Sequence, residues 1–119
     1  NIIHGHLIMA QNKIIKGIGN PVIMSFRFKK GDFSALGLNT FTSITLDIGN
    51  ETYTTILNPA NLFIVSNTQL RLKIGDTTAL AVGTYLPEIV GFSATYNDGY
   101  LISGLCNLVL SSIYIVDCP

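Results

Sequence analysis

Apolar and polar side chains alternate along this sequence, and this pattern most constrains its fold. Every second residue is apolar in Val22 to Lys29, in Gln69 to Ile74 and, within the expected strand Phe41 to Ile48, from Ser43 onward. Successive side chains of a β-strand point to opposite faces, so a strand with one buried face alternates in this way. Three groups of residues are therefore expected to point into a core: Val22, Met24, Phe26 and Phe28; Ile44, Leu46 and Ile48; Leu70, Leu72 and Ile74.

Residues that favour turns separate these segments. Gly49-Asn50 is expected to form a two-residue hairpin turn, since both residue types tolerate positive φ angles. Asn97-Asp98-Gly99 predicts a second tight turn, between a long strand from Thr84 to Ala94 and a returning strand from Tyr100 to Leu105. Leu108 to Val116 is expected to close the sheet as one buried strand.

The predicted long strand is apolar on both faces, which favours a central position. Pro87 lacks an amide hydrogen, so one edge of the strand should be free or bulged there. Glu88 is either an outward-facing acid or a buried acid that bonds to a tyrosine or to Arg27.

Between Ile74 and the long strand, one helical turn is expected in Asp76 to Leu80. Asp76 or Thr77 would cap it, and Leu80 would plug the end of the fold. Ala79-Leu80 and Leu62-Phe63 are expected in the core.

These patterns predict an all-β fold. No window of ten or more residues has the apolar spacing of an amphipathic helix, and turn residues recur roughly every 8–12 residues. An antiparallel two-sheet sandwich, immunoglobulin-like in outline and with about seven or eight strands, fits best. Its 119 residues favour one domain, residues 9–119. Met9-Ala10 is typical of a translation start, so residues 1–8 are expected to be an added leader or a flexible arm.

The charge balance restricts the partners. Seven basic and seven acidic residues give zero net charge, which provides no field to attract nucleic acid. No apolar run reaches the ~20 residues of a membrane helix, so we expect no membrane partner. Hydrophobic residues make up 48% of the chain against 12% charged, so some apolar surface should remain exposed. Such surface favours contacts with other protein subunits, in a homo-oligomer or a larger assembly.

Residues for catalysis or metal binding are scarce. The only histidines, His4 and His6, lie in the expected leader, which argues against Ser-His-Asp and Cys-His sites. A metal would need further ligands, so we expect no metal, no cofactor and no catalytic residue. Cys106 and Cys118 are either free thiols or a bridge that pins the C-terminal tail, and they form no C-x-x-C pair.

Three tyrosines are candidates for a ligand or partner surface. Tyr53, Tyr96 and Tyr100 would form a stacking platform for a sugar or a base if they shared one surface. The alternative is that their rings pack between the sheets. The first interpretation would make the chain a small carbohydrate-binding module.

Several segments resemble a known family. They are Ala79 to Tyr85, Glu88 to Gly91, Asp98-Gly99-Tyr100, Ser103-Gly104 and the opening stretch Val22 to Asp32. In these segments the chain resembles the small immunoglobulin-like modules of tailed-phage virions, including the N-terminal domain of phage baseplate upper proteins. The resemblance implies an immunoglobulin-like sandwich and a non-enzymatic tail or baseplate component that acts through protein–protein contacts. It adds a virion to the cytoplasm as an expected location.

Overall fold

The computed structural model describes residues 13–27, 37–102, 107–108 and 112–117, which form an all-β fold. These residues contain eleven strands and one short 3-10 helix, Leu38–Thr40. No helix among them is long and apolar enough to cross a membrane. The expected all-β class is confirmed. The expected leader (residues 1–8), Phe28 and both cysteines lie outside the described residues.

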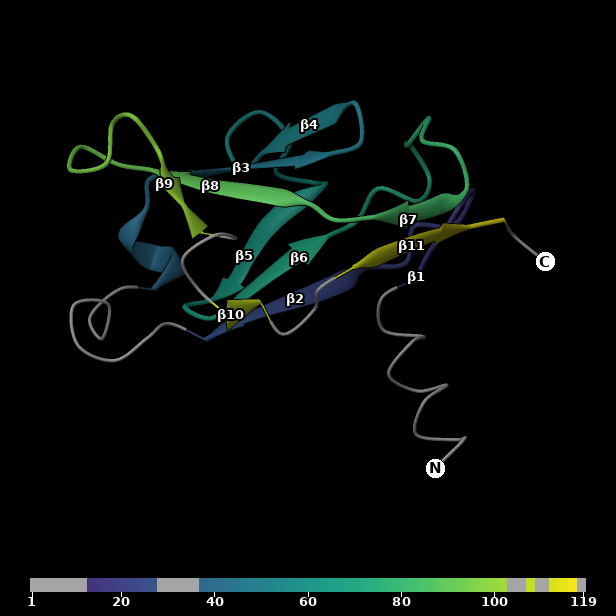
Figure 1. The fold of residues 1–119 in the computed structure, drawn as a ribbon, viewed down its shortest axis with the longest axis horizontal. Helices are drawn as coiled ribbons and strands as arrows, with labels where there is room; N and C mark the ends of the chain where they lie inside the picture. The colour runs from purple at the N-terminus through teal and green to yellow at the C-terminus, as the bar shows by residue number, and fades with distance from the viewer. Residues whose placement is uncertain (1–12, 28–36, 103–106, 109–111, 118–119) are drawn as a thin grey trace.

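Two four-stranded antiparallel sheets face each other across the core. The first sheet has the order β10-β2-β6-β5, with β10 (Asn107–Leu108), β2 (Val22–Arg27), β6 (Gln69–Leu72) and β5 (Leu62–Ser66). The second sheet has the order β4-β3-β8-β9, with β4 (Glu51–Thr54), β3 (Ser43–Ile48), β8 (Glu88–Phe92) and β9 (Tyr100–Leu101). Figure 1 shows β5 and β6 running obliquely to β3 and β8, as in a sandwich whose two sheets cross.

A third sheet adds to this sandwich. It has the order β1-β11-β7, with β1 (Lys13–Ile15), β11 (Ile113–Val116) and β7 (Gly83–Tyr85). The pairing of β1 with β11 is parallel, whereas β11 and β7 pair antiparallel. Ile14, Ile113 and Ile115 from this sheet join the same buried cluster as residues of the two larger sheets. The prediction of only two, purely antiparallel sheets is therefore too simple.

The core confirms the predicted alternation. Val22, Met24 and Phe26 are buried on β2, and Leu70 and Leu72 are buried on β6. The predicted inward residues of β3, Ile44, Leu46 and Ile48, are buried as well. Ile74, which follows β6, is also buried as predicted. One buried face per strand thus supplies the apolar area that holds the sheets together.

The predicted long strand from Thr84 to Ala94 is wrong in the structure. The chain forms β7 in the third sheet, leaves it at Leu86 and Pro87, and enters the second sheet as β8. Proline has no amide hydrogen for a ladder bond, so the change of sheet falls where the ladder would be broken anyway. Leu86 is 73% exposed and Pro87 is buried, while β8 lies centrally between β3 and β9 as expected.

Two other predicted strands also differ. Leu108 to Val116 is not one strand, because β10 pairs with β2 and β11 pairs with β1 and β7. The β8–β9 hairpin exists, but its last pair is Gly91 with Tyr100, so the connection is longer than the predicted tight turn. Gly99 has a φ of 100°, which explains the glycine at the end of that connection. These breaks raise the strand number above the predicted seven or eight.

The two remaining local predictions are confirmed in part. Ile48 pairs with Glu51 around a two-residue turn, but only Gly49, at φ 58°, has a positive angle. After Ile74 the chain makes a single turn, closed by the amide of Thr78 donating to the Ile74 carbonyl at 2.7 Å. In this turn the Thr78 hydroxyl accepts a hydrogen bond from the Leu80 amide. The capping side chain is therefore that of Thr78 and not, as predicted, that of Asp76 or Thr77. Leu80 is buried, as expected.

Candidate functional site

Ionisable groups that could perform chemistry are sparse in the described part of the chain. It contains no group of three or more His, Cys, Asp or Glu residues that could hold a metal ion. Glu88 is exposed on β8, which confirms the first of its two predicted positions. His4 and His6 lie outside the described residues.

The three candidate tyrosines do not share one exposed surface. Tyr53 and Tyr100 are buried, with 9% and 8% of their surface exposed. Tyr96 is partly buried, and its ring meets the Tyr100 ring edge-on at 5.0 Å between centroids. Both rings also pack against Phe41, at 5.9 and 5.7 Å. A stacking platform requires a common surface, whereas Tyr53 and Tyr100 face the core and pack the sheets.

Glu51 joins strand β4 to the segment that follows Ile74. Its Oε1 accepts hydrogen bonds from the Tyr53 and Thr78 hydroxyls at 2.6 and 2.7 Å, and its Oε2 accepts one from the Ala79 amide at 2.9 Å. Burial raises the pKa of the Glu51 carboxyl, but these bonds together outweigh burial and hold the pKa below its ordinary value. Burial, together with the bond to Glu51, raises the pKa of Tyr53 to about 12. Both shifts move the pKa values further from neutral pH. This suits a structural role, in which Glu51 ties β4 to the segment after Ile74, better than proton transfer.

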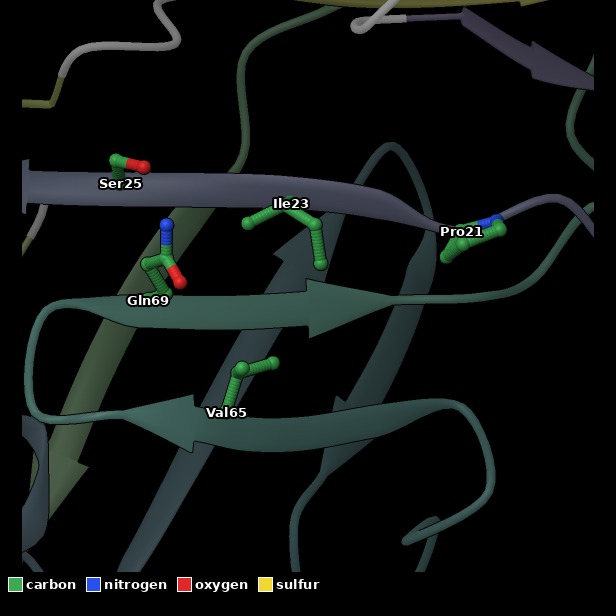
Figure 2. Close-up of a pocket in the computed structure, with 5 residues that line it drawn as sticks. All are labelled: Pro21, Ile23, Ser25, Val65 and Gln69. Atoms are coloured by element: carbon green, nitrogen blue, oxygen red, sulfur yellow. The ribbon is translucent and has the colours of Figure 1, made fainter.

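A groove crosses the outer face of the first sheet. It is open, has a volume of about 490 Å³, and is lined by Pro21, Ile23, Ser25, Val65 and Gln69. Figure 2 shows Ile23, Gln69 and Val65 side by side on β2, β6 and β5, with other strands passing behind them. None of the described lining residues is ionisable, so this part of the groove offers apolar surface with hydroxyl and amide groups.

Arg71 lies on the same face, in the middle of a row of three cross-strand partners. Its neighbours are Ile23 on β2 and Phe63 on β5. The guanidinium carbon lies 5.1 Å from the centroid of the Phe63 ring, within the range of a cation–π contact. The Nε of Arg71 is buried and has no hydrogen-bond partner among the described residues. Among the described residues, an aromatic ring and not a carboxylate therefore contacts this cation.

Large apolar side chains surround Arg71 on this outer face. Phe63 and Val65 are each 47% exposed, and Ile23 is 39% exposed. Single exposed apolar residues are ordinary, but neighbouring ones on one sheet face mark a contact surface. We call this surface the Arg71 face and define it as the outward residues of β2, β6 and β5: Ile23, Ser25, Phe63, Val65, Gln69 and Arg71.

Sequence reasoning missed this surface because it assigned Leu62-Phe63 as a unit to the core. Leu62 is buried, but Phe63 follows it in a strand and must point the other way. The prediction for Ala79-Leu80 is correct for Leu80, which is buried, and wrong for Ala79, which is exposed. One sequence feature did point to this surface: the alternation of Gln69 to Ile74 places Arg71 outward. That Phe63 lies beside Arg71 follows only from the pairing of β5 with β6.

No family model, no curated protein and no solved structure matches this chain.

Proposed function

We propose that this chain is a non-enzymatic structural module that docks onto other protein subunits through the Arg71 face. The observation that carries the proposal is the row of Ile23, Arg71 and Phe63, in which two half-exposed apolar side chains flank a cation that no carboxylate in the described part of the chain pairs with. Aromatic and arginine side chains are enriched in protein interfaces. Covering the exposed half of Phe63 alone would contribute about 2 kcal/mol, from ~100 Å² of apolar surface.

The proposal extends to a phage or prophage tail or baseplate component with an immunoglobulin-like sandwich. Its support is the sequence resemblance, strongest between residues 79 and 104. Strands β7, β8 and β9 lie in this range. They belong to an all-β fold, and an immunoglobulin-like sandwich is also all-β. The alternative of a carbohydrate-binding module has less support, because it relied on an exposed platform that includes Tyr53 and Tyr100, and both are buried.

Mass spectrometry of tail particles purified from cells that carry the gene tests the virion role. We expect peptides of this chain in fixed proportion to the tail proteins, and tail or capsid genes beside its own gene. Particles that lack the chain would refute the virion role.

A pair of variants tests the docking face. The double variant Phe63→Ser and Val65→Ser should be lost from the particles while retaining its melting temperature, since both side chains are half exposed. Leu86→Ser is the matched control, because Leu86 is 73% exposed on the connection between β7 and β8. Normal incorporation of the double variant would place the docking surface elsewhere.

A further inference from the structure

The two four-stranded sheets carry opposite charges, although the chain as a whole is neutral. The strands of the first sheet contain arginine but no Asp or Glu: β2 has Arg27 and β6 has Arg71. The strands of the second sheet contain Asp47, Glu51 and Glu88 but no Lys or Arg. The charged residues within the strands are therefore all basic in the first sheet and all acidic in the second.

The outer face of the second sheet combines two acids with apolar residues. Asp47 on β3 and Glu88 on β8 are direct cross-strand partners, and both point outward because Leu46, Ile48 and Ile89 point into the core. Like charges directly opposite each other on a sheet repel. The Thr52 hydroxyl donates a hydrogen bond to Asp47, but no described cation pairs with either acid.

Apolar residues continue this face away from the acids. Val90 and Phe92 follow Glu88 on the same side of β8, and Leu101 on β9 pairs with Val90 and is 41% exposed. Gly99 lies against Val90 and Phe92, so the β8–β9 connection partly covers them. We call this surface the acidic face and define it as Asp47, Glu88, Val90, Phe92 and Leu101.

We propose that the Arg71 face of one copy of this chain docks on the acidic face of a second copy. The inference rests on the docking role proposed above and names its partner. Each face carries what the other lacks. One has a cation that contacts an aromatic ring, and the other has two opposed carboxylates. Exposed apolar side chains lie on both faces, Ile23, Phe63 and Val65 on the Arg71 face and Leu101 on the acidic face, so contact buries apolar surface and pairs charges together.

The charges also select the geometry of association. A two-fold dimer through either face would place like surfaces against each other, Arg71 near Arg71 or Glu88 near Glu88. Contact between unlike faces avoids this repulsion. Because the two faces lie on opposite sides of one sandwich, such a contact is heterologous and repeats from copy to copy, to form a ring or an open stack.

Light scattering on the purified chain tests the association directly. At low ionic strength we expect a mass above that of one chain, rising with concentration. Salt screens charges beyond about 8 Å at 0.15 M, so the association should weaken as salt is added. A single-chain mass at every concentration at low ionic strength would overturn the proposal.

Charge reversal identifies the two faces. Arg71→Glu and Glu88→Arg should each weaken self-association by about tenfold or more, since each sets like charges against each other. Lys13→Glu and Asp117→Arg are matched controls, with the same change in charge on β1 and after β11, and they should associate as the unchanged chain does. If Glu88→Arg associated normally, the acidic face would not be the docking partner.

Mixing the two face variants separates lost contact from lost fold. The carboxylate introduced by Arg71→Glu complements the guanidinium introduced by Glu88→Arg, and each variant keeps one natural face. An equimolar mixture of the two variants should therefore regain the association that each lacks alone. A mixture that stays at single-chain mass would refute the heterologous contact. Self-association and presence in tail particles are separate measurements, so either proposal can fail without the other.

Discussion

Replacing Gly91 by alanine should destabilise the fold, although a methyl group ordinarily favours a strand. Gly91 lies in β8 beneath the ring of Phe41, and a Cβ added there would lie 2.5–2.8 Å from three carbons of that ring. The φ of Gly91 is not positive, so the backbone itself accepts alanine. Phe41 is only 5% exposed and packs on Tyr96 and Tyr100, so its ring has little room to move.

The magnitude follows from two opposing terms. Alanine in place of glycine within a strand contributes about 0.5–1 kcal/mol to stability. Forcing a methyl group into a packed core costs about 1–3 kcal/mol. We therefore expect Gly91→Ala to lower the free energy of unfolding by about 1–2 kcal/mol, which corresponds to a fall of roughly 4–8 °C in melting temperature for a domain of this size.

Urea and thermal unfolding of a double-mutant cycle with Phe41→Leu provide the assay. Phe41→Leu alone should destabilise the protein, but in the Gly91→Ala background the smaller side chain should relieve the overlap. The two changes should then differ from additivity by about 1 kcal/mol or more. Gly83→Ala is the control, because its added Cβ would meet only the Tyr85 ring, at 3.7 Å or more, and should be neutral or slightly stabilising. A rise in melting temperature for Gly91→Ala, or simple additivity with Phe41→Leu, would refute this account of the packing.

Further perturbations concern the hydrogen bonds that Glu51 accepts from Tyr53, Thr78 and Ala79, and the 3-10 helix that precedes β3. Glu51→Gln should cost about 1–2 kcal/mol in urea unfolding at pH 7, because the carboxylate accepts three hydrogen bonds, and equal stability would contradict this structural role. The depressed pKa of Glu51 means that its contribution is complete above its unfolded pKa and is lost as pH falls through the folded value, so acid should destabilise the unchanged chain more than Glu51→Gln. Because the pKa of Tyr53 is raised from 10.0 to about 12, stability should fall as pH rises through that interval, and Tyr53→Phe should reduce this alkaline loss. Gly37→Ala should lower the melting temperature, because the added Cβ would overlap the Asn67 side chain that bonds the Asn39 amide, and an unchanged melting temperature would argue against that contact.

The sequence alone identified most of the core but little of the candidate surface. The inward residues of β2, β3 and β6 were predicted correctly because side-chain direction within a strand is a local property. The same local reasoning failed at Leu62-Phe63 and Ala79-Leu80, where adjacent apolar residues left the buried face undecided. It also left the tyrosines undecided between a surface platform and packing between the sheets, because the exposure of Tyr53 and Tyr100 depends on what packs over them.

By itself, then, the sequence determined an all-β fold, the turn between Ile48 and Glu51 and the buried face of its regular strands. Only the tertiary structure decided that Pro87 marks a change of sheet, that Phe63 lies beside Arg71, and that Asp47 lies opposite Glu88. Equal numbers of acidic and basic residues conceal the separation of charge between the two larger sheets. The physical reason is that alternation fixes where a side chain points, whereas strand pairing between distant segments fixes which side chains become neighbours.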